Sequence, residues 1–270
     1  TLSGTNRTMT QILQKLGMPA PASAHAPGID DFIGYVHLLM LILFVGWLAY
    51  YLLALFRFRK AASPKADYTG VRSNMSTYLE IGVAIVEAVL LVGFAVPLWA
   101  RAVEDFPVAK GDPKTDPIEV QIMGQQYKWS AHYAGPDAKW GKQDIKSASA
   151  TNPFGLVEGD ADGKDDVVCA LGEPFKVPTG RAVICKVSSM DVIHSFKIPS
   201  MRVTQDAIPG MAIPAHFIPT KVGKYSITCA QLCGSGHSAM RGDFEVVTPE
   251  EYETWYAEKA KAGGGAGGFE

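Results

Sequence analysis

Two stretches near the N-terminus are apolar at every position of the helical repeat. Residues 32–56 (FIGYVHLLMLILFVGWLAYYLLALF) contain no Lys, Arg, Asp or Glu, and as a helix they would be about 37 Å long. Residues 79–100 form the second stretch, in which Glu80 and Glu87 are the only charged side chains. Because a core helix of a water-soluble protein has a polar face over such a length, the pattern predicts a transmembrane hairpin over residues 32–101.

The charges around the two stretches predict their orientation. Residues 17–31 hold no Lys or Arg, whereas the connecting segment 57–78 is basic. Its five basic side chains, against Asp67 alone, are Arg57, Arg59, Lys60, Lys65 and Arg72. Cytoplasmic loops carry an excess of Lys and Arg, so residues 57–78 are predicted to be cytoplasmic, and both the N-terminal segment 1–31 and everything after Arg101 extracytoplasmic.

A cleaved secretory signal is the alternative for the first apolar stretch. The apolar part of such a signal would be about 7–15 residues long and would lie at the very N-terminus. Here the stretch is longer, and about thirty residues come before it. A membrane span is therefore the favoured interpretation.

Three ionisable side chains inside the predicted spans need an explanation, because charge is costly in lipid. Glu80 lies one residue into the second span, where an interfacial position is the simplest interpretation. Glu87 lies deeper, which points to a partner helix rather than to lipid. His37, in the first span, is expected to be a packed histidine.

The pattern changes after Pro117 to short runs rich in β-branched and aromatic residues, separated by Gly, Pro and Asp. Runs such as IEVQIMGQQYKWSAHY, RAVICKVSS and GKYSITC predict an antiparallel sandwich or barrel over residues 117–248. Residues 139–166 have little apolar periodicity and are expected to form one long loop.

A helix is predicted at the end of the chain, over residues 249–262. Thr248 is a capping residue, Pro249 occupies the first helical position, and Glu251 occupies the third. The glycine-rich residues 263–270 are expected to be a flexible tail.

Charge and cysteine content narrow the classes of function. A net charge of −2 gives no cationic field, so nucleic acid is not an expected partner. Four cysteines are too few for a disulfide scaffold in a chain of 270 residues. Cys169 and Cys185 lie on two strands predicted to be neighbours, and both a disulfide and two buried thiols remain open.

An acidic cluster in the long loop suggests a calcium-binding loop. Its members are Asp160, Asp162, Asp165 and Asp166, grouped around Gly163. The bidentate Glu that such a loop requires at its twelfth position is missing, since residue 171 is Leu. A solvated acidic loop is the favoured interpretation.

The most informative segment, residues 229–240, lies directly after a predicted strand. It reads CAQLCGSGHSAM and places two thiols, an imidazole and a thioether within twelve residues. These side chains belong to Cys229, Cys233, His237 and Met240. Thiolate and thioether ligands favour copper, and such a loop with a second His upstream, here His194, is how mononuclear cupredoxin sites are built.

The second cysteine exceeds what a single copper ion needs. Two thiolates can bridge two copper ions, with His194 and His237 as terminal ligands and Met240 as a weak ligand of one ion. The other copper ion would be bound by a backbone carbonyl between the cysteines, for which Gln231 is the candidate. One electron shared over two metals changes each bond length little, which suits electron transfer.

Two other chemistries compete for the same residues. A zinc site would use the two Cys and two His but has no use for Met240. A thioredoxin-like redox pair would need a C-x₂-C spacing in a βαβ setting.

These motifs together resemble a known family. Residues 123–130 (MGQQYKWS), 191–199 (DVIHSFKIP), 206–210 (DAIPG) and the loop 229–240 are similar to segments of subunit II of cytochrome c oxidase, the haem-copper terminal oxidase. The resemblance covers roughly residues 30–255. It implies a transmembrane hairpin followed by a cupredoxin-like Greek-key β-sandwich or barrel and a C-terminal helix.

The resemblance also implies a binuclear copper A centre and a function. The implied ligands are His194, Cys229, Gln231 through its carbonyl, Cys233, His237 and Met240. Electrons from a cytochrome c-type donor would pass through the copper to haem in subunit I, where oxygen is reduced to water and protons are pumped. The chain would lie among the other oxidase subunits in a bacterial inner membrane, with the cupredoxin domain on the periplasmic side.

Three positions are singled out by comparison with the family pattern. Tyr127, with Lys128 and Trp129 after it, stands where the family usually has the surface tryptophan that receives electrons. If electrons do not enter at Tyr127, the alternative is a donor that docks differently and is held in a supercomplex. Gln231 stands where the family commonly has Glu, which helps bind magnesium or manganese at the boundary with subunit I, so that ion would rely mainly on subunit I. Glu80 resembles the glutamate at the entrance of a proton path, while Glu87 has no counterpart.

Two other classes of function remain as alternatives. A quinol oxidase subunit II has the same hairpin and fold but lacks the copper ligands, whereas all six positions are intact here. A membrane-tethered copper-delivery protein would have no need for Glu80 or for the aromatic segment 123–130.

Overall fold

The computed structural model describes residues 10–65, 68–69, 72–112 and 114–262. The chain divides into two compact units, one made of Thr1–Met18 with Gly28–Arg101 and the other of Pro19–Pro27 with Ala102–Glu270. The predicted flexible tail at 263–270 and parts of the predicted cytoplasmic loop lie outside the described residues.

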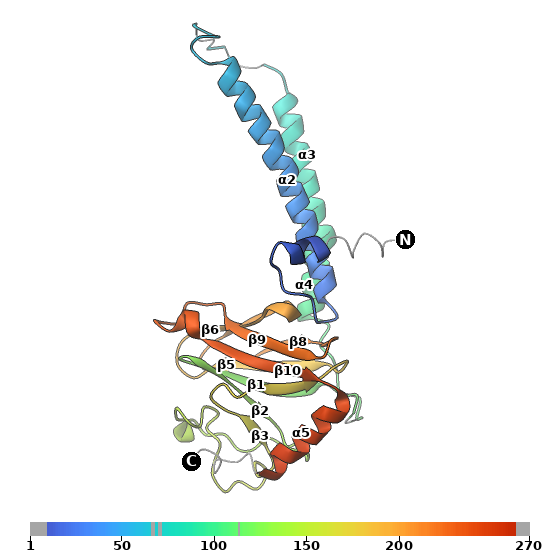
Figure 1. Cartoon of the computed structure of the whole chain (residues 1–270), viewed down its shortest axis with the longest axis vertical. Coiled ribbons are helices and arrows are strands. Elements are labelled where there is room, and N and C mark those ends of the chain that lie inside the picture. Colours follow the sequence, from blue (N-terminus) through green and yellow to red (C-terminus); the bar gives the residue numbers. More distant parts are fainter. Residues whose placement is uncertain (1–9, 66–67, 70–71, 113, 263–270) are drawn as a thin grey trace. The chain divides into compact units, whose positions relative to one another are not determined.

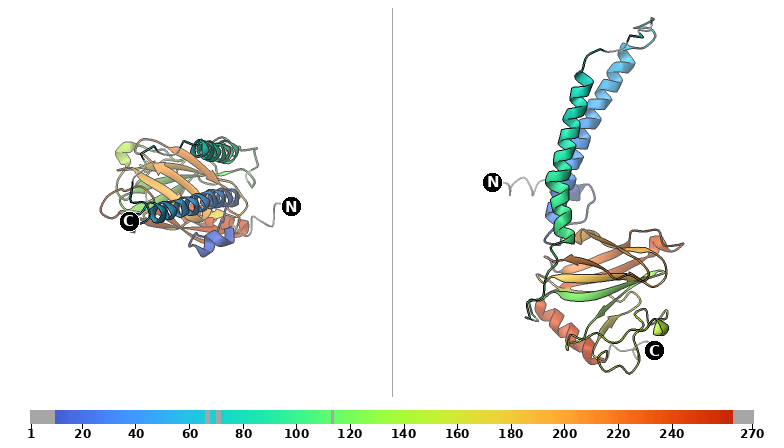
Figure 2. Two further views of the ribbon diagram at one scale, coloured as in Figure 1. Left: turned by 90° about the horizontal axis from the view of Figure 1, so that it is seen from above. Right: turned by 180° about the vertical axis from the view of Figure 1, so that it is seen from behind.

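The first unit is built from two long apolar helices that run side by side (Figure 1, Figure 2). Helix α2 spans Ala26–Arg57, and the second helix continues from α3 (Met75–Leu90) through a π-helical turn (Leu91–Ala95) into α4 (Val96–Val103). Both are long and apolar enough to cross a membrane. The π turn comes just before Pro97. Proline has no backbone N–H, so one hydrogen bond of the regular helix is missing at this point.

The second unit is a β domain with ten strands in the described residues. Their bounds are β1 Ile118–Gln125, β2 Lys128–Tyr133, β3 Val167–Cys169, β4 Phe175–Pro178, β5 Val183–Ser189, β6 His194–Ile198, β7 Val203–Ala207, β8 Ile213–Phe217, β9 Gly223–Cys229 and β10 Arg241–Val247. Two five-stranded sheets, ordered β3-β2-β1-β5-β8 and β4-β10-β9-β6-β7, stack as layers (Figure 2). Apolar residues of both inner faces form one core, which confirms the predicted two-sheet cupredoxin-like fold.

The sequence predicts an antiparallel sandwich or barrel, but two of its strand pairs are parallel. β1 pairs with β5 in parallel, and β10 pairs with β4 in parallel. Such pairs join segments that are distant in the chain, so the local alternation of residues gives no sign of them. β1 and β5 are nevertheless buried at alternate positions, as the run pattern predicts.

Cys169 and Cys185 do not lie on neighbouring strands. They belong to β3 and β5, which are separated by β2 and β1, and both are free thiols in the core. Burial raises the pKa of each thiol to about 12. Of the two interpretations left open by the sequence, the structure has buried thiols.

The acidic cluster of the long loop is not simply a solvated face. Asp166 is fully buried, and its carboxylate lies 2.6 Å from Nε2 of His132 while accepting hydrogen bonds from the backbone N–H groups of Gly135 and Gly141. Asp162 pairs with Lys139 at the surface. Apart from the short 3₁₀ helix Ile145–Ser147, residues 139–166 form no helix or strand, as predicted.

The C-terminal helix α5 (Pro249–Ala262) begins as predicted. The N–H of Glu251 donates to Oγ1 of Thr248 at 3.3 Å, and the N–H of Thr248 donates to the Glu251 carboxylate at 3.0 Å. Trp255 and Tyr256 pack their rings against Tyr133 of β2, with centroids 5.8 and 6.1 Å away.

One feature that the sequence did not predict is the segment Pro19–Pro27, called the strap below, which joins the β domain although it leads directly into α2 and includes the first two residues of that helix. Ser23 forms an antiparallel bridge with Pro219, and the N–H of Ala24 donates to the carbonyl of Ile218 at 2.9 Å. The hydroxyl of Ser23 donates to the carbonyl of Met201 at 2.7 Å.

Candidate metal centre

The segment 229–240 connects the adjacent antiparallel strands β9 and β10 at one end of the second sheet. Cys229 ends β9, and the 3₁₀ turn His237–Ala239 returns the chain to Met240 just before β10. The N–H of Ala230 donates to the carbonyl of Ser195 at 2.9 Å, which fixes the loop against β6. The loop is thus held from both sides by strands of one sheet.

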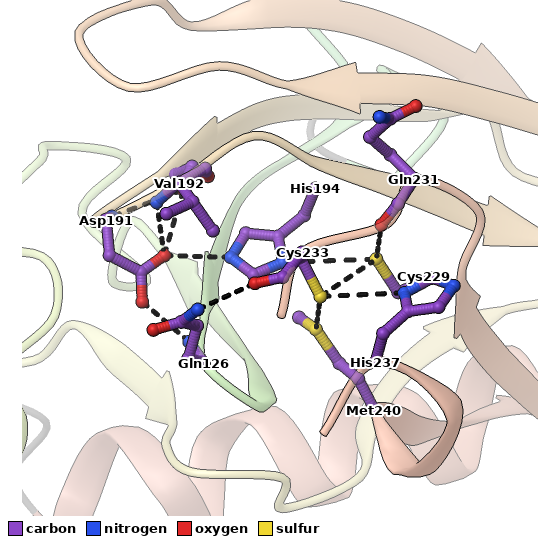
Figure 3. Close-up of polar contacts among 10 residues, drawn as sticks. Gln126, Asp191, Val192, His194, Cys229, Gln231, Cys233, His237 and Met240 are labelled. Carbon is purple, nitrogen blue, oxygen red and sulfur yellow. Dashed lines mark hydrogen bonds and ion pairs between the residues drawn. The ribbon is translucent and has the colours of Figure 1, made fainter. Parts of the chain in front are cut away.

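The fold gathers the donor atoms around the two cysteine sulfurs (Figure 3). The two Sγ atoms lie 3.8 Å apart, and Sγ of Cys233 lies 3.6 Å from Nδ1 of His237 and 3.8 Å from Sδ of Met240. Sγ of Cys229 lies 3.1 Å from the carbonyl oxygen of Gln231. The two sulfurs therefore lie beside each other, and each also has separate donor atoms nearby: the carbonyl oxygen of Gln231 for Cys229, and His237 and Met240 for Cys233.

His194 completes the set from the start of β6 and is fully buried. Its Nδ1 lies 3.9 Å from Sγ of Cys229, and its Nε2 lies 2.8 Å from the carboxylate of Asp191. A carboxylate accepts, so Nε2 carries the proton and the lone pair of Nδ1 points toward the sulfurs. All six sequence-predicted ligand positions are thus brought together in one place.

Asp191 and Gln126 support the centre from outside the loop, and sequence reasoning did not single out either (Figure 3). The N–H of Gln126 donates to Asp191 at 2.7 Å, and its side-chain amide donates to the carbonyl of Cys233 at 2.6 Å. Burial raises the pKa of Asp191, but hydrogen bonds from Gln126, His194 and Val192 outweigh it and lower the pKa. The signal was present, since both residues belong to the quoted motifs 123–130 and 191–199.

The thiol of Cys233 is protonated in the absence of metal. Burial and the neighbouring Cys229 raise the pKa of Cys233 to about 11. A metal ion that binds here must therefore displace the proton of Cys233, and binding is expected to weaken as the pH falls.

The chemistry of the donors fits copper better than zinc. His194, Cys229 and Cys233 form a compact group of ligand atoms within 4.8 Å of one another, the one such His, Cys, Asp or Glu group among the described residues. The thioether of Met240 and the carbonyl of Gln231 lie beside the same sulfurs. A structural zinc site needs four N or S ligands and leaves both of these without a role, whereas soft thioether and thiolate ligands suit copper.

The other predicted functional residues lie in different settings. Tyr127 is half-buried beside the metal-binding loop, with its hydroxyl 3.3 Å from Oγ of Ser235. Trp129 is 3% exposed and packs edge-on against His194 and Phe196, with ring centroids 5.9 and 5.4 Å away. Trp129 therefore packs against a candidate ligand in the interior and is not a surface residue that a donor protein contacts. Glu80 lies in α3, which belongs to the helical unit.

Comparisons with known proteins point to one family. Residues 118–247 match the sequence model of the family described as "Cytochrome C oxidase subunit II, periplasmic domain". The alternative cytochrome c oxidase subunit 2 of Bradyrhizobium diazoefficiens is 31% identical over 240 residues, which cover 88% of this chain and 83% of that protein. The cytochrome c oxidase subunit 2 of Cereibacter sphaeroides is 28% identical over 255 residues, covering 90% and 78%.

A solved structure is also similar to part of this chain. The crystal structure of the periplasmic domain of subunit II of cytochrome oxidase (CoxB) from Bradyrhizobium japonicum is 24% identical and covers 54% of this chain and 94% of that one, with a TM-score of 0.40.

Proposed function

Since the chain belongs to the cytochrome c oxidase subunit II family and is a subunit of a haem-copper oxidase, we propose that it receives electrons for the complex through a binuclear copper A centre. The observation that carries the proposal is the pair of sulfurs 3.8 Å apart, each with its own further donors. One bridging pair with two sets of terminal donors suits two copper ions rather than one.

Six residues would hold the copper: the two cysteines, through their sulfurs, and four further donors. They are Cys229, Cys233, His194, His237, Met240 and the carbonyl of Gln231. When bound, the two ions would accept and pass on single electrons. The chain itself would hold His194 in one tautomer through Asp191, bury the sulfur of Cys233 and hold the loop between β9 and β10.

The partners follow from the same proposal. A cytochrome c-type donor would approach near Tyr127, and a donor held in a supercomplex would meet the same surface. Electrons would continue to haem in subunit I, where oxygen is reduced to water and protons are pumped. Glu80 would lie at the entrance of a proton path into subunit I, and a magnesium or manganese ion at that boundary stays a prediction.

The proposed location is a bacterial inner membrane. The two apolar helices would span it, and the basic segment 57–78 would face the cytoplasm. The β domain, with its metal centre, would then face the periplasm.

The test of this function is electron paramagnetic resonance on the copper-loaded chain in detergent, together with a metal count. We expect two copper ions per chain and hyperfine structure from one electron shared equally by two copper nuclei. A signal from a single copper ion, or a silent site filled by zinc, would contradict the binuclear centre and favour a tethered metal-binding protein.

The variant Cys229→Ser tests the role of the bridge in the assembled oxidase. Loss of one bridging thiolate is expected to abolish fast oxygen consumption with the physiological donor, because electrons no longer reach subunit I. The matched control is Cys169→Ala, which removes a core thiol outside the centre and should leave oxygen consumption intact. Unchanged oxygen consumption in Cys229→Ser would contradict the copper assignment.

A further inference from the structure

Glu87 lies near the middle of the second membrane helix. That helix spans Met75–Val103, and Glu87 is about 18 Å along it from Met75 at about 1.5 Å per residue. The helix is 29 residues long, which is about 43 Å, so the carboxyl group belongs to the central part of the hydrocarbon layer. A carboxylate at this depth is strongly unfavourable if it faces lipid.

Glu87 shares a helix face with two residues that are half-buried within the hairpin. Val83 and Leu90, at positions i−4 and i+3, are both half-buried in the hairpin, whereas Glu87 between them is exposed. Residues with this spacing share one face of a helix. Glu87 therefore stands on the face of α3 that carries contacts within the hairpin, yet the hairpin does not cover it.

In the described part of the chain, helix α2 forms no hydrogen bond or ion pair with Glu87. The ring contact between Tyr35 and Phe94, with centroids 5.7 Å apart, fixes how the antiparallel helices face each other. About two turns along from this contact, Glu87 is level with the segment 38–49 of α2 (LLMLILFVGWLA). This segment has no charged or hydroxyl side chain, and its one side-chain hydrogen-bond donor is the indole N–H of Trp47. Among the described residues, no hydrogen bond or ion pair reaches Glu87.

We propose that Glu87 is a docking residue for a transmembrane helix of subunit I, which presents a hydrogen-bond donor at the middle of the membrane. This helix would pack against the α3 face formed by Val83, Glu87 and Leu90. Inside a membrane, a polar group on a helix surface is satisfied by a polar side chain of a neighbouring helix. The proposal uses the membership of the chain in the oxidase complex but does not depend on copper.

The test uses the whole oxidase, purified through a tag on this chain from a host that lacks its own copy. The variant Glu87→Val is expected to lower the amount of subunit I that remains bound at increasing detergent by about 3- to 20-fold, the range for a lost hydrogen bond between membrane helices. If Glu87→Val keeps as much subunit I as the unmodified chain, the carboxyl faces lipid and the proposal is overturned.

Two further variants sharpen the result. Glu87→Gln removes the charge and keeps a hydrogen-bonding group. If this variant retains subunit I, the donor on the partner helix is a neutral side chain, and if it loses subunit I, the donor is a basic side chain. The double variant Glu87→Val with Val89→Glu moves the carboxyl about 200° around the helix at nearly the same depth, to a residue that is 56% exposed. It should bind subunit I no better than Glu87→Val, and rescue of binding would contradict a specific contact.

Copper content serves as the independent readout. Each Glu87 variant should retain the copper content and the paramagnetic signal of the unmodified chain, because the metal centre belongs to the other unit. A failure of the docking proposal would therefore leave the proposed electron transfer untouched, and a failure of the copper assignment would leave the docking result interpretable.

Discussion

Gln126 connects two parts of the metal centre that are far apart in the chain. Its backbone N–H binds Asp191, which orients His194, and its side-chain amide binds the carbonyl of Cys233. Partners of this kind outside the ligand set typically change metal affinity by about 10- to 100-fold when removed. Gln126 is thus a positioning residue for both halves of the site.

The variant Gln126→Ala should keep the backbone contact with Asp191 and lose the contact with Cys233. We expect copper affinity to fall by about tenfold or more and the hyperfine pattern to broaden, because the loop is no longer fixed. Competition with a copper chelator and paramagnetic resonance measure both effects. Gln125→Ala is the matched control, since the neighbouring Gln125 donates to Ala150 instead; equal behaviour of the two variants would contradict the positioning role.

Tyr127 is the aromatic residue beside the loop that a donor could touch. Its ring closely covers Gly234 and Gly236, and any side chain at these glycines would collide with it. Removing a central aromatic residue of an interface typically costs more than about 1 kcal/mol, which is about fivefold in affinity.

Tyr127→Ala is therefore expected to slow turnover with the native donor by about fivefold or more at low donor concentration. Tyr127→Phe, which loses only the hydroxyl contact with Ser235, should keep most of the rate. Stopped-flow reduction by the donor measures both variants. If Tyr127→Ala reacts as fast as the unmodified chain, electrons arrive elsewhere.

Single residues also show how far the sequence leads. The spacing of Cys229, Cys233, His237 and Met240 predicts the donors, because one short loop holds them and the chemistry of the side chains is sufficient. The support from Gln126 and the burial of Trp129 depend on how β1 and β2 pack against the loop. Local sequence contains no measure of such contacts.

At the scale of elements, the strap Pro19–Pro27 meets β8 at two histidines. Burial lowers the pKa of His25, and the proximity of His216 lowers it further. Burial also lowers the pKa of His216, although Asp105 partly opposes this. The folded domain therefore favours the neutral form of both imidazoles.

This arrangement predicts that the β domain loses stability in mild acid. An unfolded histidine has a pKa near 6.5, so the unfolded chain takes up protons first as the pH falls below that value. The stabilisation is present above about pH 6.5 and is lost as the pH falls through the lowered folded values. Thermal unfolding at pH 7.5 and pH 5.5 should show a lower midpoint at the acidic pH.

The double variant His25→Gln with His216→Gln isolates this contribution from the other titrating groups. Its unfolding midpoint should fall less between the two pH values than that of the unmodified chain. An equal fall would show that the strap histidines do not contribute.

The elements differ in how well the sequence predicts them. The two apolar helices and α5 were predictable, because hydropathy and the capping pattern at Thr248 are local signals. The strap, the parallel pairs β1–β5 and β4–β10, and the buried Asp166 were not. Each of these depends on a contact between segments that are distant in the chain, which a local pattern does not encode.

At the scale of the whole molecule, the distribution of basic residues predicts sidedness. In intact spheroplasts, externally added trypsin should cleave the β domain, for example after the exposed Lys221 or Lys224, and should leave the basic segment 57–78 intact. Inverted membrane vesicles should give the opposite pattern. Immunoblotting of the fragments checks both, and cleavage within 57–78 from the outside would contradict the proposed orientation.

The strap has a consequence for how the chain is made. Ser23 pairs with Pro219, so about 200 residues separate the two partners, and both membrane helices lie between them. At a synthesis rate of about 5–20 residues per second, the ribosome needs about 10–40 s to deliver the second partner after the first. During that interval the first helix can enter the membrane while the polar backbone of the strap still lacks its permanent hydrogen bonds. The earliest part of the β domain to leave the ribosome is thus among the last to be locked in place.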